Sequence, residues 1–203
     1  MGNFMCDEDI KDIDMERKIY ERKIYDKILN KTICDLEIIQ EIDSKFNINY
    51  VIDRNNCWSL LMNAVLQNRI ELVRHFMTYP NININYKDRR NHTALYFAYG
   101  RSSILKLLLK REDLDVNMRY EHGNTILHRY SNVKGYVKVL LLDVRIDISI
   151  RNNMGKTARD IAIHWEYYGI ADMLRRVQYT SLLRIPNKAL LYDIVRTIIC
   201  EYV

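Results

Sequence analysis

A motif that returns at a nearly fixed interval constrains the fold of this chain more than any other feature. Each copy begins with a hydroxyl residue and continues with small or aliphatic residues, at Ser59, Thr93, Thr125 and Thr157. The successive spacings are 34, 32 and 32 residues, and a second aliphatic run follows each copy. A repeat of this length is one supersecondary unit that buries its hydrophobic face only against its neighbours. The sequence therefore predicts an array of stacked helix pairs.

The residues inside the repeat explain how one unit is built. The hydroxyl group can cap a first helix by accepting a backbone N–H. The following leucine (Leu127 in the third copy) and a later alanine, found at Ala64, Ala98 and Ala162, are expected to face neighbouring helices. The second helix ends before an Asn-rich segment that is expected to be extended and to lead into a hairpin turn. The abundance of Asn, Ile and Tyr is interpreted as coding bias rather than as a functional signal.

The third copy, Thr125-Ile-Leu-His128, resembles the Thr-Pro-Leu-His start of an ankyrin repeat. The resemblance implies an all-α fold, an ankyrin-repeat solenoid of helix–turn–helix repeats joined by hairpin loops. It also implies that His128 orients its turn through hydrogen bonds. The pattern departs from the family at Tyr130, where a small alanine is usual, and in two shortened turns. The second helix is expected about two residues early in the second repeat, and the third turn about one residue short.

The chain of 203 residues divides by this register into three parts. Residues 1–52 are predicted to be an N-terminal helical cap or a degenerate first repeat. Residues 53–177 are predicted to hold four repeats, at about 53–86, 87–118, 119–150 and 151–177. The repeat pattern then ends, and residues 178–203 form a separate C-terminal tail.

The tail admits two interpretations. Leu183-x-x-Pro186 leads into apolar residues that share one broad helix face, as expected either for a simple cap of the array or for a docking helix. As a docking helix, the tail resembles the start of an F-box. The repeats and the tail together then resemble poxvirus ankyrin proteins with a PRANC C-terminus. That resemblance implies binding to the Skp-type adaptor of a cullin–RING ubiquitin ligase. The implied contacts are Leu182, Leu183, Pro186, Leu190, Leu191, Ile194, Val195 and Ile198.

The target of the array is expected at the hairpin tips and first helices, the surface that stacked repeats leave open. The residues expected to be exposed there are Asn55, Arg89, Arg90, Tyr120, Glu121, His122 and Asn152. The resemblance implies that the target is a host protein of defence signalling. The competing hypothesis is a sequestering module with no ligase contact.

Other function classes find little support in the residues. No Ser/His/Asp or Cys/His constellation, metal-ligand spacing or phosphate-binding loop stands out, so we expect neither an enzyme nor a cofactor. The net charge of +5 is spread along the chain, which argues against nucleic acid as a partner. No apolar run is long enough to span a membrane. Four scattered cysteines favour a reducing compartment, and the expected location is the host cytoplasm, with the nucleus as an alternative.

Overall fold

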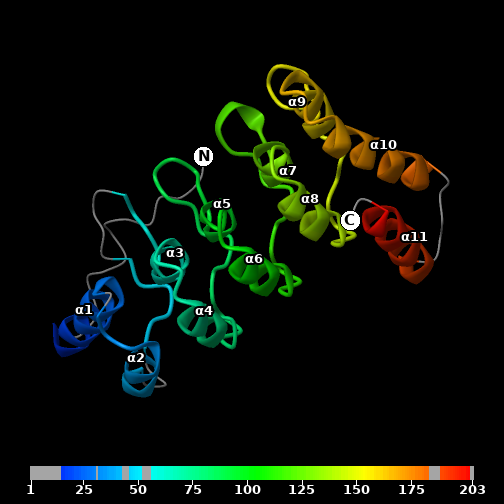
Figure 1. Cartoon of the computed structure of the whole chain (residues 1–203). Helices are drawn as coiled ribbons and strands as arrows, with labels where there is room; N and C mark the ends of the chain where they lie inside the picture. The colour runs from blue at the N-terminus through cyan, green and yellow to red at the C-terminus, as the bar shows by residue number, and fades with distance from the viewer. Residues whose placement is uncertain (1–14, 31, 43–45, 52–55, 183–187, 202–203) are drawn as a thin grey trace. The chain divides into compact units, whose positions relative to one another are not determined.

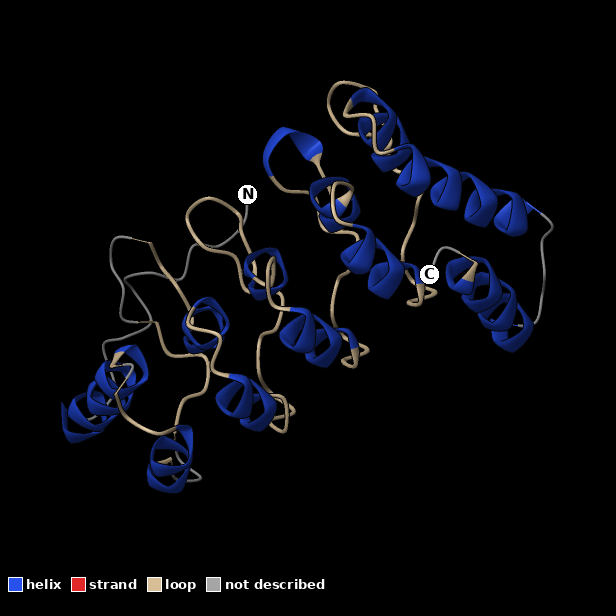
Figure 2. Cartoon of the chain, in the orientation of Figure 1, coloured by secondary structure: helices blue, strands red, loops and turns tan. Residues whose placement is uncertain are grey.

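The computed structural model describes residues 15–30, 32–42, 46–51, 56–182 and 188–201. They belong to two compact units, Met1–Leu114 (unit 1) and Asp115–Val203 (unit 2), and each unit is described by itself. Helices and connecting loops make up both units (Figure 2). Within the described ranges the only extended pairing is an isolated antiparallel bridge between Val51 and Ser59. The predicted all-α fold class is confirmed.

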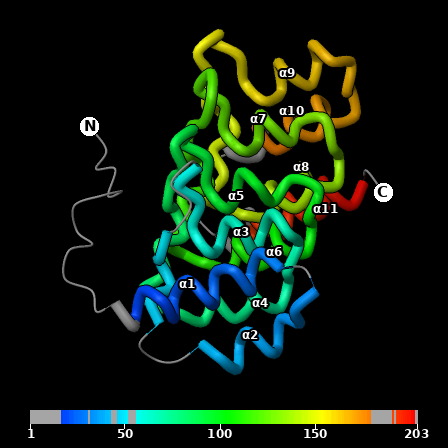
Figure 3. The backbone as a smooth tube through the Cα atoms, turned by 90° about the vertical axis from the view of Figure 1, so that its left-hand side faces the viewer, coloured from blue at the N-terminus to red at the C-terminus, as the bar shows by residue number. Residues whose placement is uncertain are grey.

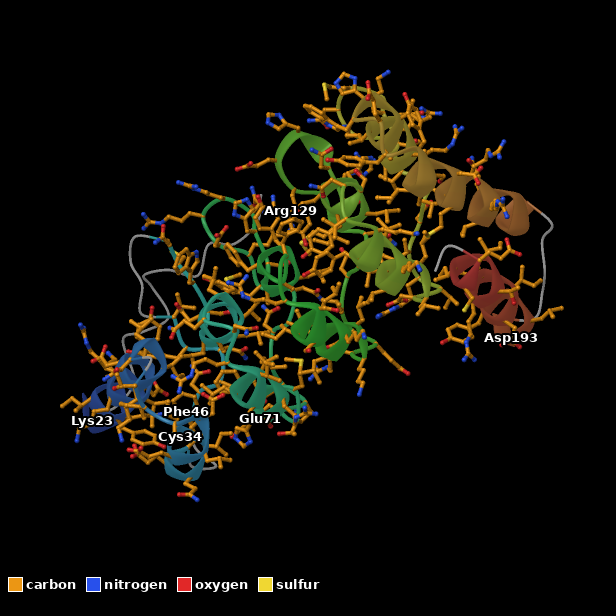
Figure 4. The ribbon with its side chains drawn as sticks, viewed as in Figure 1. Lys23, Cys34, Phe46, Glu71, Arg129 and Asp193 are labelled. Atoms are coloured by element: carbon orange, nitrogen blue, oxygen red, sulfur yellow. The ribbon has the colours of Figure 1, made fainter. Side chains whose placement is uncertain are left out.

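The described residues of unit 1 form three helix pairs. They are α1 (Met15–Leu29) with α2 (Asp35–Glu41), α3 (Leu60–Leu66) with α4 (Ile70–Phe76), and α5 (Ala94–Phe97) with α6 (Ser102–Leu109). Figure 1 shows α1, α3 and α5 as one row and α2, α4 and α6 as a second row, and Figure 3 shows the same helices side by side from another direction. Phe46 is buried near α1, with its ring 6.1 Å from that of Tyr20 (Figure 4). The N-terminal segment therefore contributes a helix pair of its own.

Unit 2 begins with a short 3₁₀ turn, η1 (Glu121–Gly123), and continues with two helix pairs and a last helix. The pairs are α7 (Ile126–Tyr130) with α8 (Lys134–Leu141) and α9 (Ala158–His164) with α10 (Tyr168–Leu182). The last helix is α11 (Lys188–Cys200), which packs on α10. Helix α10 continues past residue 177, the expected end of the fourth repeat, so residues 178–182 extend the last repeat helix.

The hydroxyl residues cap the first helices as predicted. Ser59 Oγ accepts the N–H of Met62 at 3.2 Å, and Thr93 Oγ1 accepts the N–H of Tyr96 at 3.4 Å. Thr157 Oγ1 accepts the N–H of Asp160 at 3.2 Å. Each bond satisfies a backbone donor that has no partner inside the helix. The cap explains why these helices begin one residue after the repeating hydroxyl.

The predicted core positions are also confirmed. Leu127 is only 2% exposed, and the alanines at 64, 98 and 162 are fully buried. Tyr130, which replaces the usual alanine, is fully buried as well, and its ring lies 5.2 Å from that of Tyr136. The third repeat therefore accommodates the larger side chain inside unit 2.

The turns between paired helices have two lengths. Helix α4 begins eleven residues after Ser59 and α10 eleven residues after Thr157, whereas α6 begins nine residues after Thr93. This confirms the shortening expected in the second repeat. Helix α8 also begins nine residues after Thr125, so the third turn is two residues short rather than the one expected.

The Asn-rich arms bond one repeat to the next within each unit. In unit 1, Asn49 Nδ2 donates to the Asn81 carbonyl at 2.9 Å, and Asn49 Oδ1 accepts the Asn83 N–H at 2.7 Å. In unit 2, Asn117 does the same with the Arg145 carbonyl and the Asp147 N–H, at 2.7 and 2.9 Å. One carboxamide thus satisfies a donor and an acceptor of the neighbouring arm. The asparagines at positions 49 and 117 therefore have a structural role.

A buried arginine joins the first two helix pairs of unit 1. Arg69 Nη1 donates to the Ile28 carbonyl at 2.9 Å, and Arg69 Nη2 donates to the Ile33 carbonyl. Its Nε donates to the Asp35 carboxylate at 2.6 Å. Arg101 makes a similar link, donating to the Leu66 carbonyl at 2.6 Å. These bonds satisfy carbonyls at helix ends and tie consecutive turns together.

We expect Leu127→Ala to lower the free energy of unfolding by about 2–5 kcal/mol, because it removes a buried side chain and leaves a cavity. Val144→Ala is the control, since Val144 is exposed in the same unit and its change is expected to stay within about 0.5 kcal/mol. Chemical denaturation of both variants measures the difference. Equal effects of the two substitutions would contradict the assigned register.

Candidate functional site

Three hairpin tips share one hydrogen-bond pattern, at residues 88–92, 120–124 and 152–156. In the first, the Asp88 N–H donates to the His92 carbonyl and the Asn91 N–H donates to the Asp88 carbonyl, both at 2.9 Å. The other two tips repeat both bonds with partners 32 and 64 residues later. The fourth residue of each tip has a positive φ, between 60° and 72°, at Asn91, Gly123 and Gly155. Three of the predicted hairpin turns are therefore present, and the first, at 53–56, lies mostly outside the described residues.

The first residue of each tip is buried, which corrects two predictions. Tyr120 and Asn152 were expected to be exposed, but both are buried, as Asp88 is at the same position. Asn152 Oδ1 accepts the N–H groups of Met154 and Lys156, both at 3.0 Å, and so closes the turn. These residues shape the tip from beneath and offer little surface to a partner.

The next two residues of each tip carry the exposed side chains. Arg89 and Arg90 are exposed in unit 1, and Glu121 and His122 are exposed in unit 2, as expected. The corresponding pair in the last tip is Asn153 and Met154, which sequence reasoning did not include, although the same register points to it. Asn55 lies outside the described residues.

Consecutive tips touch each other within a unit. The Asn153 N–H donates to the His122 carbonyl at 2.9 Å, and the Arg89 N–H donates to the Asn56 carbonyl at 3.3 Å. A Cβ at Gly123 would collide with the Asn153 side chain, so this approach requires glycine. Within each unit, neighbouring turns are therefore bonded to each other and form one continuous surface.

An aromatic cluster lies beside the tip of unit 1. The indole of Trp58 donates from Nε1 to the Asp88 carboxylate at 3.2 Å, and its ring lies edge-on to Phe97 at 5.8 Å. Tyr96 stacks on His92 with the ring centroids 3.7 Å apart. Trp58, Tyr96 and Phe97 are all half-buried. We call these three residues the aromatic cluster.

Sequence reasoning did not single out the residues of the aromatic cluster. The available signal was three aromatic residues, each within four positions of a capping hydroxyl, in two successive repeats.

The unit 1 tip is strongly basic. Lys87, Arg89 and Arg90 are exposed, whereas Asp88 between them is buried. The Asp88 carboxylate accepts the N–H groups of Arg90 and His92 at 2.8 and 2.7 Å, in addition to the Trp58 indole. Because this carboxylate is enclosed by its own turn, the exposed charge of the tip is positive. In unit 2 the corresponding exposed pair is Glu121 and His122, so that tip lacks the cluster of exposed basic residues.

The described part of the tail packs against the last repeat helix. Val195 and Ile199 are buried where α11 meets α10, and Arg176 Nη1 donates to the Glu201 carboxylate at 2.7 Å. Asp193 lies on the exposed side of α11 (Figure 4). Val195, one of the predicted docking residues, is therefore buried within the chain and is not exposed to an adaptor.

The other predicted docking residues differ in exposure. Leu190 is 50% exposed, and Ile194 and Ile198 are half-buried. Leu183 and Pro186 lie outside the described residues. Leu182 lies in α10 and Leu191 in α11, but their side chains are not among those described.

His128 holds the third repeat to the fourth. Its Nδ1 accepts the Thr125 N–H at 3.2 Å, and its Nε2 donates to the Lys156 carbonyl at 3.0 Å. The first bond belongs to the capping box of α7. Burial lowers the pKa of the His128 imidazole, and the hydrogen bond to the Lys156 carbonyl opposes this shift only in part. The orienting role that the family resemblance implied for this histidine matches these bonds.

The described residues contain no group of three or more His, Cys, Asp or Glu placed to hold a metal ion. None of the helices in the described ranges combines the length and apolar character needed to cross a bilayer.

A comparison with protein families places ankyrin repeats in this chain. The family model described as ankyrin repeats (3 copies) matches residues 30–120, which includes α2 to α6. No curated protein matches the chain. The match assigns ankyrin repeats to residues 30–120, and the later helix pairs continue the same all-α repeat pattern. Ankyrin repeats indicate a protein-binding module.

We expect the stability of the protein to fall as the pH drops below about 6.5, the ordinary pKa of histidine. Because the pKa of His128 is lowered by folding, the unfolded chain binds more protons than the folded chain in this window, and stability rises with pH. His128→Asn keeps an acceptor for the Thr125 N–H but cannot titrate. Its thermal melting curves should therefore be less stable than wild type at pH 7.5 and converge with wild type towards pH 5.5.

The matched control is His122→Asn, at an exposed tip position whose φ of 58° suits asparagine. Its melting temperature should follow the wild-type profile in parallel. A His128→Asn profile that also stays parallel to wild type would contradict the linkage.

Proposed function

We propose that this chain binds a target protein on unit 1, through the basic tip Lys87, Arg89 and Arg90 together with the aromatic cluster. The observation that carries the proposal is the position of the cluster. Trp58 is bonded to Asp88, the residue that closes the basic tip. Charged and aromatic side chains therefore share one surface. Trp, Tyr and Arg are the residues that most often dominate binding energy at protein interfaces.

The aromatic cluster suits a protein partner better than a nucleic acid. Single-stranded nucleic acids bind by stacking bases on free ring faces. Here Tyr96 stacks on His92, and Trp58 and Phe97 meet edge-on. With these rings packed on one another and half-buried, the cluster offers an apolar surface beside the arginines. Side chains of a folded or extended protein segment can fill such a surface.

The resemblance to poxvirus ankyrin proteins supports a more specific version of this function. In that version the chain is a viral protein that acts in the host cytoplasm and captures a host defence protein. The tail then recruits a cullin–RING ligase through a Skp-type adaptor. The feature of the tail that favours this version is Leu190, which is 50% exposed one and two helical turns before the half-buried Ile194 and Ile198. A short apolar stripe of this kind can enter a groove on a partner.

The alternative is that the tail only covers the last repeat. Val195 and Ile199 support it, because both are buried where α11 packs on α10. The two roles use different sides of α11, so one helix can cover α10 and still present Leu190. Separate substitutions on the two sides distinguish them.

For the target site, we expect the double variant Arg89→Glu/Arg90→Glu to lose capture of the host protein that the wild-type chain retains. The melting temperature should hardly change, because both side chains are exposed and the turn is held by backbone bonds. The control is Lys106→Glu/Lys110→Glu, an equal charge reversal at exposed positions on and after α6. Quantitative affinity capture from host-cell extract checks both. Equal capture by the two variants would place the target elsewhere.

For the tail, we expect Leu190→Asp to abolish capture of the Skp-type adaptor and leave the melting temperature nearly unchanged. Val195→Ala should instead lower the melting temperature by several degrees, because it removes buried methyl groups between α10 and α11. Pull-down with purified adaptor and a thermal melt are run on both variants. If the wild-type chain retains no adaptor, the ligase proposal is wrong and α11 only covers α10.

A further inference from the structure

The last repeat leaves open a face that is covered in earlier repeats. The sixth residue after the capping hydroxyl is Val65 in the repeat of α3 and Ser131 in the repeat of α7, and these are 0% and 2% exposed. A further first-row helix follows each of them in the same unit, α5 beside α3 and α9 beside α7. The same position after Thr157 is Ile163, which is 39% exposed. Helix α9 has its preceding neighbour α7 but, within the described residues, no following first-row helix.

Helix α11, the described part of the tail beyond residue 187, packs on α10. In Figure 1, α11 runs beside α10, the second helix of the last pair. Beyond the end of α9, Trp165 is 63% exposed, with its ring edge-on to that of His164. We call Ile163, with the charged residues described next, the open face of α9.

Two charged residues border Ile163, one on each side along the chain. Arg159 replaces the leucine that stands at 61, 95 and 127, and its buried Nε has no hydrogen-bond partner among the described residues. Glu166 follows the helix in a left-handed conformation with φ 63°, and its side chain is exposed. The nearby Asp160 carboxylate is occupied by Thr157, whose N–H and hydroxyl both donate to it. Along the chain, the open face therefore has a positive residue, Arg159, then the apolar Ile163, then a negative residue, Glu166.

We propose that the open face of α9 binds the same face of a second copy of this chain, in an antiparallel arrangement about a two-fold axis near Ile163. Reversal by the two-fold axis places Arg159 of one copy next to Glu166 of the other, and Glu166 next to Arg159. Ile163 meets Ile163 at the centre. The interface is isologous, so it closes at a dimer and does not extend into a fibre.

The spacing along the helix fits this arrangement. Arg159 lies about 6 Å before Ile163 along the helix axis, and Glu166 lies about 4.5 Å after it. The two charges are thus at similar distances from the proposed axis. The long arginine side chain can bridge the difference of about 1.5 Å between them. The guanidinium group of Arg159 gains a carboxylate partner from the other copy. A parallel arrangement would instead bring like charges together, which is unfavourable at an interface.

A second copy fits this surface better than an unrelated partner does. The charge pattern is complementary to its own reversal, whereas a foreign helix would need the same pattern by coincidence. The chemistry is also that of repeat stacking, in which apolar helix faces cover each other. The proposal is independent of the target site, because the basic tip and the aromatic cluster belong to unit 1.

Sedimentation equilibrium of the full chain over a concentration series tests the proposal. We expect a monomer–dimer equilibrium for the wild type. Ile163→Asp should raise the dissociation constant at least about tenfold, because it buries a charge at the centre of the interface. Arg159→Glu and Glu166→Arg should each weaken the dimer as single variants. The double variant Arg159→Glu/Glu166→Arg should restore it, since both cross-copy pairs are formed again with reversed sign.

The double variant is the decisive control, because a substitution that merely disturbs folding would not be rescued by a second one. Thermal melting of each variant confirms that unit 2 stays folded. A wild-type chain that remains monomeric throughout the series overturns the proposal. So does a dimer that survives Ile163→Asp, or a double variant that associates no better than the single variants.

Discussion

The structure depends on the fact that no helix pair of this chain is large enough to bury its own apolar face. The first helices α3, α5, α7 and α9 are short, and α5 has only four residues, so each of these pairs gains much of its core from the pair beside it. Leu61 and Leu127 show the result, since both are buried on faces that meet neighbouring helices. Where the leucine becomes Arg159, the same face remains open. Stability and the capacity to bind other molecules thus follow from one constraint.

Polar side chains complete this stacking by bonding to the backbone of the next repeat. Asn49, Asn117, Arg69 and His128 each reach a carbonyl of a neighbouring helix end, arm or turn. Buried backbone groups without partners are costly, and the turns of short helices expose many of them. These side chains let closely spaced turns pack without leaving such groups unsatisfied. In the third repeat a histidine provides the link, so we expect this part of the packing to depend on pH.

The surfaces left for partners differ between the units. Unit 1 presents three exposed basic residues beside half-buried aromatic rings, whereas unit 2 presents Glu121 and His122 at one tip and Asn153 and Met154 at the next. The tail adds a further surface at Leu190, on a helix whose opposite side covers α10. The proposals therefore assign a target, a second copy and an adaptor to separate sets of residues. Each proposal names residues that the others do not use.

The sequence alone determined the features that depend on local chemistry and on the repeat period. The caps at Ser59, Thr93 and Thr157, the burial of Leu127 and the hairpin turns follow from residue type and register, and all are confirmed. Exposure at the tips was predictable only in part. Arg89 and Glu121 are exposed, but Tyr120 is buried, because the first position of the tip points beneath the turn.

Only the tertiary structure decided which apolar faces are covered. Val195 packs on α10 while Leu190 remains half-exposed on the same helix, and the stripe in the sequence does not distinguish them. Trp58 and Phe97 meet although 39 residues separate them, and Ile163 is exposed at a position that is buried elsewhere. Residue type and period fix what a side chain prefers. Whether a neighbour is present to satisfy that preference depends on contacts between segments that are distant in the sequence.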